Sequence, residues 1–153
     1  MNSLLTLFDS ISKDLGELTE LAKRKTTAVR RNDLTELNQI LKEEQALALS
    51  LRGLEQKRAA LLAQLGLQDL PLQDVPGKAG DALLQRAKTS VENLRKSYEI
   101  YRSAAETARN TLECNLHEIE KFLAASGADV SVNTGYRPVE VDPPAPMKAD
   151  FRA

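Results

Sequence analysis

Several features are scarce or missing in this sequence, and each absence excludes a class of protein. The chain has no tryptophan, three phenylalanines, three tyrosines, one histidine and one cysteine. A single cysteine cannot form an internal disulfide. No segment approaches the roughly 18 apolar residues that a membrane span requires, and no N-terminal stretch joins a basic start to an apolar run. We therefore predict a cytoplasmic protein with no membrane span.

Net charge is also lacking, because 21 basic side chains almost balance 22 acidic ones. Such a chain has no field strong enough to attract nucleic acid or an anionic membrane, so its partners must be recognised by shape. The densest basic cluster consists of Lys23, Arg24, Lys25, Arg30 and Arg31. Cations are favoured at the end of a helix, and no aromatic residues interleave with these. We interpret the cluster as a solvated helix end and predict no nucleic-acid partner.

The residues that usually carry chemistry are too few for a catalytic or metal site. His117 has Cys114 three residues before it and Glu113 four before it, which places all three on one helix face. Zinc proteases need two histidines and di-iron bundles need carboxylates from several helices. Gly77 and Gly80 lack the lysine spacing of a phosphate loop. We predict no enzyme, no metal and no cofactor.

What the sequence does contain is typical of long helices. Leu, Ala, Glu, Lys, Arg and Gln dominate, and 153 residues suit one domain. The predicted fold class is all-α. We expect an antiparallel bundle of three long helices, with a short fourth as an option, packed like a coiled coil over residues 1–126. A flexible, proline-containing tail is expected over residues 127–153.

The first two predicted helices meet at a corner. Asn2 or Ser3 is expected to cap the first, which runs to about Arg31, and Asp33 with Glu36 forms a reciprocal capping pair for the second. The apolar residues recur in steps of three and four. These seam positions are Leu4, Phe8, Ile11, Leu15, Leu18, Ala22 and Val29, then Leu37, Ile40, Leu47, Leu51, Leu54, Leu61 and Leu65.

Charged residues interrupt both seams, with Lys25 in the first and Glu44 and Arg58 in the second. Gly66 is expected to end the second helix in a left-handed conformation, with Leu67 folding back. Prolines mark residues 66–80 as a connection between helices. Its apolar residues are expected to pack across the end of the bundle, namely Leu67, Leu70, Leu72 and Val75.

The third predicted helix covers residues 81–125, ends at Gly127 and should lie along both earlier helices. Its seam contains one polar residue, Asn115, which either sets the register or marks where the bundle opens to a partner. The seam residues are Leu84, Ala87, Val91, Leu94, Tyr98, Tyr101, Ala105, Ala108, Leu112, Asn115, Ile119 and Phe122.

Near its end this helix gains a second apolar row, so its apolar face broadens. The row consists of Leu112, Leu116, Ile119 and Leu123, joined by Phe122. Two interpretations stay open: a wider core contact with the start of the first helix, or a surface for a partner helix. Beyond Gly127 the apolar residues of the tail, such as Val130 and Val139, allow it to fold onto another surface.

The order of these features resembles the FlgN family of flagellar export chaperones. The resemblance is carried by Asp33-Leu34-Thr35-Glu36-Leu37, Glu43-Glu44-Gln45 and Leu54-Glu55-Gln56-Lys57-Arg58, followed by the proline-rich connection, the long third helix and the tail. It implies a cytoplasmic chaperone that binds C-terminal helices of hook-filament junction proteins and keeps them unassembled before secretion. The resemblance also implies that Tyr136 faces the export gate of the flagellar secretion apparatus.

Two other functions compete with this interpretation. A stalk or coupling coiled coil of a type III secretion system would use the same long helices without needing the tail, so tail deletion would discriminate. A homo-oligomeric structural coiled coil is disfavoured because charges interrupt the second seam and the connection implies an intramolecular bundle.

Overall fold

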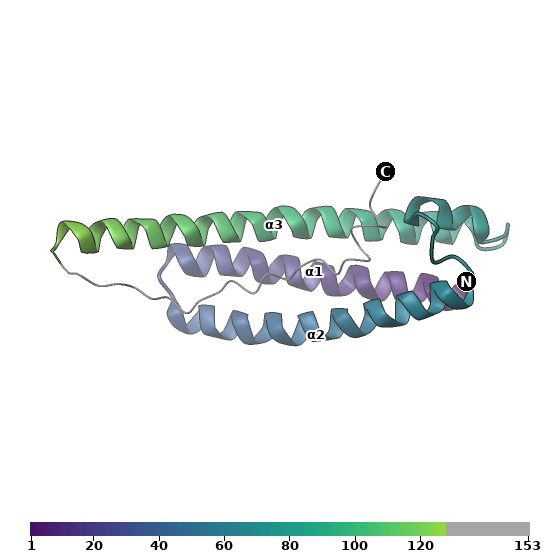
Figure 1. The fold of residues 1–153 in the computed structure, drawn as a ribbon, viewed down its shortest axis with the longest axis horizontal. Coiled ribbons are helices and arrows are strands. Elements are labelled where there is room, and N and C mark those ends of the chain that lie inside the picture. The colour runs from purple at the N-terminus through teal and green to yellow at the C-terminus, as the bar shows by residue number, and fades with distance from the viewer. Residues whose placement is uncertain (128–153) are drawn as a thin grey trace.

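The computed structural model describes residues 1–127, which form helices and, within that range, no strand (Figure 1). Helix α1 spans Asn2–Arg30, α2 spans Leu34–Gln64 and α3 spans Leu84–Ala125, with a short 3-10 helix, η1, at Leu72–Lys78. This confirms the all-α bundle of three long helices and the short fourth. None of the described helices has an apolar stretch long enough to cross a membrane. The predicted tail lies outside the described residues, apart from its first residue.

Consecutive long helices are antiparallel, so α1 and α3 run in the same direction (Figure 1). The side-chain contacts give the register. Near the start of α1, Asp9 accepts a hydrogen bond from Ser90 at 2.8 Å, and near its end the carbonyl of Val29 accepts one from Asn115 at 2.9 Å. Because both pairs advance together along the chain, the start of α1 lies beside the start of α3.

Helix α1 lies between the other two long helices. It packs along both α2 and α3, whereas α2 and α3 form no comparable contact with each other. The expectation that the third helix lies along both earlier helices is therefore wrong. A helix between two neighbours must be apolar on two sides. This explains why α1 buries residues outside its predicted seam, namely Leu5, Leu7, Thr19, Leu21, Thr26 and Ala28.

The corner between α1 and α2 is built by local hydrogen bonds. Asn32 adopts a left-handed conformation with φ 54, and its backbone N–H donates to the carbonyl of Val29 at 3.1 Å. The N–H of Asp33 donates to the carbonyl of Ala28 at 2.9 Å. These are the two bonds that commonly close a helix end, with asparagine in the place where glycine is usual.

The helix starts differ in part from the prediction. Asp33 caps α2 by accepting a hydrogen bond from the backbone N–H of Glu36 at 3.0 Å, as expected. The reciprocal half of that cap is replaced, because the Glu36 carboxylate accepts from Arg24 instead. Met1 occupies the capping position of α1 and makes no side-chain capping bond, so the expected cap by Asn2 or Ser3 is wrong.

The connection from α2 to α3 folds against the bundle. Gly66 has φ 67, and the N–H of Leu67 donates to the carbonyl of Leu62 at 2.8 Å, which confirms the predicted end of α2. In η1, Leu72 and Val75 are buried in the main core. Leu67 and Leu70 pack against that core while partly exposed. The expected packing of this connection is therefore confirmed.

Candidate partner-binding site

A polar latch fixes α3 beside the corner of the other two helices. The side-chain amide of Asn115 donates to the carbonyl of Val29 at 2.9 Å and to Oδ1 of Asn32 at 3.3 Å. Asn115 is partly buried in the apolar seam. Without these hydrogen bonds its side-chain amide would be buried without a partner, which costs free energy. The position of Asn115 thus couples the end of α1 to one point along α3.

Beyond this latch α3 continues alone. Residues 116–125, which we name the projecting end, extend past the corner where α1 ends (Figure 1). At 1.5 Å per residue the projecting end is about 15 Å long. No described helix covers it, because α1 stops at Arg30 and α2 runs back from Leu34.

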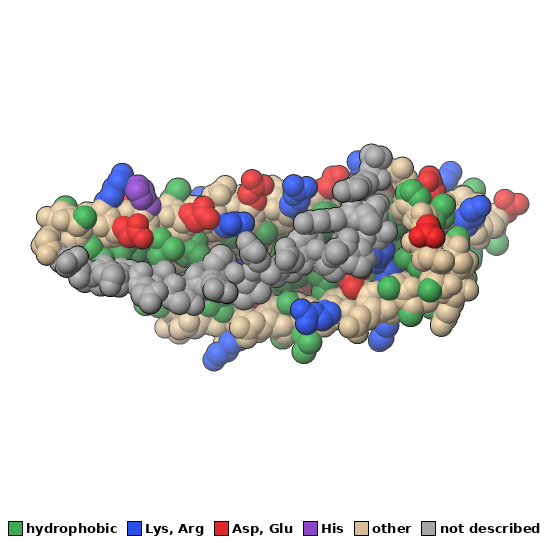
Figure 2. Space-filling view, in the orientation of Figure 1, with side chains coloured by type: hydrophobic (Ala, Val, Ile, Leu, Met, Phe, Trp, Pro, Cys, Tyr) green, Lys and Arg blue, Asp and Glu red, His purple; other side chains and the backbone are tan. Residues whose placement is uncertain are grey.

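The projecting end carries much of the predicted apolar row. Phe122 is 73% exposed and Ile119 is 44% exposed, while Leu116 and Leu123 are half-buried. Hydrophobic side chains are visible on this end at the left of Figure 2. Four of the predicted partner-binding residues therefore share one short stretch of helix, and two of them face solvent.

The other predicted residues fall elsewhere. Leu112 lies on the bundle side of Asn115, where it is half-buried. Tyr136 lies outside the described residues. The alternative of a wider core contact with the start of α1 is wrong, because the parallel register places that start beside Arg86 and Ser90. Because α1 and α3 run in parallel, the end of α3 lies at the same end of the bundle as the end of α1, far from the start of α1.

Sequence reasoning missed two features of this neighbourhood. Leu34, the first residue of α2, is 72% exposed and adds an apolar side chain at the corner. Asn32 is the acceptor for the latch, and nothing in the seam pattern points to it because it lies outside every helix. A left-handed asparagine after a helix is recognisable only as a turn signal.

Each of the three charged residues that interrupt the two seams forms an ion pair. Lys25 Nζ lies 2.6 Å from Glu44 Oε1, with side chains only 17% and 19% exposed, so the interruptions of the first and second seams pair with each other. Arg58 Nε lies 2.9 Å from Glu55 Oε2, and both residues are buried. These ion pairs lie in the bundle rather than on the projecting end.

Beside the first pair lies Tyr101 of α3. Burial raises the pKa of its hydroxyl above the usual value, and the charges of Glu44 and then Tyr98 raise it further. Glu44 belongs to α2 and Tyr101 to α3, so this effect of charge acts between two helices whose backbones are not in close contact.

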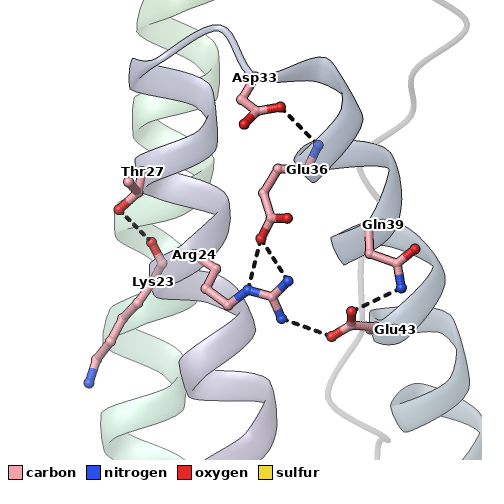
Figure 3. Close-up of polar contacts among 7 residues, drawn as sticks. All are labelled: Lys23, Arg24, Thr27, Asp33, Glu36, Gln39 and Glu43. Atoms are coloured by element: carbon pink, nitrogen blue, oxygen red, sulfur yellow. Dashed lines mark hydrogen bonds and ion pairs between the residues drawn. The ribbon is translucent and has the colours of Figure 1, made fainter.

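Most of the basic cluster is engaged in ion pairs with α1 and α2 residues. The guanidinium of Arg24 donates to Glu36 at 2.6 and 2.9 Å and to Glu43 at 2.9 Å (Figure 3). The hydrogen bonds to Glu36 and Glu43 raise the pKa of Arg24. Those from Gln39 and then Arg24 lower the pKa of Glu43. Arg24 therefore links the last turns of α1 to the first turns of α2 through hydrogen bonds.

Cys114 and His117, the residues considered for metal binding, have too few further metal-ligating side chains near them among the described residues. Cys114 and His117 are exposed on α3. Within residues 1–127, no three side chains of His, Cys, Asp or Glu gather in a way that could hold a metal ion. The solvent-facing side chains just beyond the latch include the apolar Ile119 and Phe122.

Comparison with known proteins gives one result. The family model FlgN, described as FlgN protein, matches residues 1–138. This match includes the whole bundle and the projecting end. Searches of curated proteins and of solved structures give no match.

Proposed function

Because this chain belongs to the FlgN family, a family of flagellar export chaperones, we propose that it binds the C-terminal helical segments of flagellar hook-filament junction proteins. In this proposal the protein acts in the cytoplasm and keeps those segments from assembling before secretion. Tyr136 is proposed to contact the export gate. The observation that carries the proposal is the projecting end of α3.

The projecting end has the properties of one half of a helix–helix interface. Leu116, Ile119 and Leu123 recur in steps of three and four, and Phe122 widens the row. An amphipathic segment can bury its own apolar stripe against this row by helix-in-groove recognition. Segments that would otherwise assemble with one another would then be kept apart.

The latch supports this role because it anchors α3 at the residue before the proposed surface begins. A free helix end frays, and fraying would add an ordering cost to binding. Asn115 holds α3 one residue before the projecting end begins, so the helix is anchored where it leaves the bundle. Binding is proposed to occur on a preformed ridge.

Calorimetric titration tests the proposal. The ligand is a peptide spanning the C-terminal helix of a hook-filament junction protein from the same source, and we expect saturable one-to-one binding. The double variant Ile119→Ser/Phe122→Ser should lose about 2 kcal/mol of binding free energy, roughly thirtyfold in Kd. Leu49→Ser is the matched control, because Leu49 is 70% exposed on α2.

Two results would count against the proposal. Equal weakening by the Leu49→Ser control would remove the projecting end as the specific site. Absence of binding heat at high micromolar peptide would favour the stalk or coupling protein of a type III secretion system instead.

A further inference from the structure

The two sides of the projecting end differ in exposure. Leu116 and Leu123 are half-buried, whereas Ile119 and Phe122 are exposed. Leu116 and Leu123 are seven residues apart, so they lie on the same side of α3. No described helix continues alongside the projecting end (Figure 1). The projecting end thus has a less exposed apolar side, at Leu116 and Leu123, and an open side.

The end of α3 favours a chain that turns back toward the less exposed side. Gly127 has φ 70, and its N–H donates to the carbonyl of Ala124 at 3.3 Å. In helix ends of this kind, the residue after the left-handed one commonly makes an apolar contact with the residue five positions before it. Here those two residues are Ala128 and Leu123. This type of end therefore favours an exit from α3 beside Leu123.

The residues that follow have the alternating pattern of an extended segment with one apolar side. Val130, Val132, Thr134 and Tyr136 occupy every second position. In an extended chain, side chains at alternate positions point to opposite sides, so these four share one side. The other side is polar or lacks a side chain, with Asp129, Ser131, Asn133, Gly135 and Arg137.

We propose that residues 129–137, which we name the return segment, pack in extended form on the less exposed side of the projecting end. In this arrangement Val130 lies beside Leu123, and Tyr136 reaches the level of Leu112. The apolar side of the return segment faces the apolar row of α3, and its polar side faces water. Removal of valine and leucine methyl groups from water supplies the driving force.

The lengths of the two elements agree. Val130 is three residues from Gly127 and can reach about 10 Å at about 3.3 Å per residue. Leu123 lies only about 6 Å from Gly127 along α3, at about 1.5 Å per residue. From Val130 to Tyr136 an extended chain covers roughly 20 Å. The row from Leu123 to Leu112 covers roughly 17 Å, so the return segment matches the row without being overstretched.

This packing goes beyond the proposed export function, since it needs no partner. A partner helix that binds the whole apolar row must displace the return segment, and this consequence rests on the proposed function. In the same way, Tyr136 contacts the export gate only after the return segment is released. The direct chain connection through Gly127 gives the return segment a high effective concentration at the row.

Methyl NMR of the full chain without any partner tests the packing. We expect nuclear Overhauser effects between the methyl groups of Val130 and Leu123. The variant Val130→Ser/Val132→Ser should shift the methyl signals of Leu116 and Leu123, because it removes the apolar side of the return segment. The variant Ser131→Asn/Asn133→Ser exchanges two residues on the polar side and should leave those signals in place. The methyl signals of Leu49, on α2, should not move in either variant.

Three results would overturn the proposal. The first is the absence of Overhauser effects between the valines of the return segment and the leucines of the row. The second is an equal shift of the leucine signals in the two variants, because packing would then not depend on the apolar side. The third is the appearance of these Overhauser effects between chains labelled separately and then mixed, because the occupant would then come from a second copy. Since no peptide is added, these outcomes are independent of the calorimetric test of the proposed function.

Discussion

Asn115 of α3 donates a hydrogen bond of 2.9 Å to the carbonyl of Val29, in the last turn of α1. Sequence reasoning left open whether this asparagine sets the register or marks where the bundle opens. In the structure Asn115 joins α3 to the end of α1, and α3 extends past the bundle directly after it. That a partner binds there stays a prediction. One polar side chain therefore separates the part of α3 that is packed from the part that projects.

Replacing Asn115 with alanine should weaken this boundary. We expect Asn115→Ala to lower the free energy of unfolding by about 1 kcal/mol, because two hydrogen bonds are lost at a partly buried position. Urea unfolding measures the change, and hydrogen exchange should rise first in residues 116–125. Asn110→Ala is the control, since Asn110 is exposed and its side chain makes no hydrogen bond within residues 1–127. Equal effects of the two variants would show that the latch contributes nothing specific.

The ion pair between Lys25 and Glu44 should show strong coupling. Lys25→Met leaves Glu44 half-buried without its cation, and we expect a loss of about 1–3 kcal/mol of stability. The double change Lys25→Met/Glu44→Leu should recover much of that loss, because both charges are removed together.

A double-mutant cycle by urea unfolding measures this coupling energy. The exposed pair Lys23 and Glu20, at 3.0 Å, is the control and should couple by less than about 0.5 kcal/mol. Additive effects at Lys25 and Glu44 would contradict the prediction.

Tyr101 gives the protein a dependence on alkaline pH. Burial first, and then Glu44 and Tyr98, raise its pKa above the usual value of 10.0. The folded state therefore keeps a proton that the unfolded state releases. The resulting stability is present below pH 10 and is lost as the pH rises through the raised pKa.

Ultraviolet titration of tyrosinate formation measures this pKa. Tyr101→Phe should remove the late-titrating group and the associated loss of stability. Glu44→Gln should lower the pKa of Tyr101 without abolishing its elevation, because burial is the larger cause. A titration curve unchanged by Tyr101→Phe would refute the assignment.

Two glycines in and beside α2 should respond oppositely to the same substitution. Gly53 lies inside α2 with no atom close to where a Cβ would be, so Gly53→Ala should stabilise the protein by about 0.5–1 kcal/mol. Gly66 is equally uncrowded but has φ 67, so Gly66→Ala should destabilise it by about 1 kcal/mol. Thermal unfolding measures both changes. The same sign for both variants would show that backbone conformation does not control the end of α2.

Local features of the fold were predictable because their causes lie within a few residues. Asp33 caps α2 through the N–H of Glu36, and Gly66 ends it, since caps and left-handed residues act on the nearest backbone groups. Seam residues such as Leu4, Phe8 and Ile11 are buried as their spacing predicts. The apolar row of the projecting end was visible in the same way.

The sequence by itself determined the helices, most of their ends and their apolar faces, because helical periodicity and capping depend on near neighbours in the chain. Only the tertiary structure decided that α1 lies between α2 and α3, that Lys25 meets Glu44, and that Asn115 meets the end of α1. These contacts join residues far apart in the sequence, and periodicity carries no information about which face meets which neighbour. The exposure of Ile119 and Phe122 likewise follows from where α1 ends relative to α3, which depends on the register between two helices.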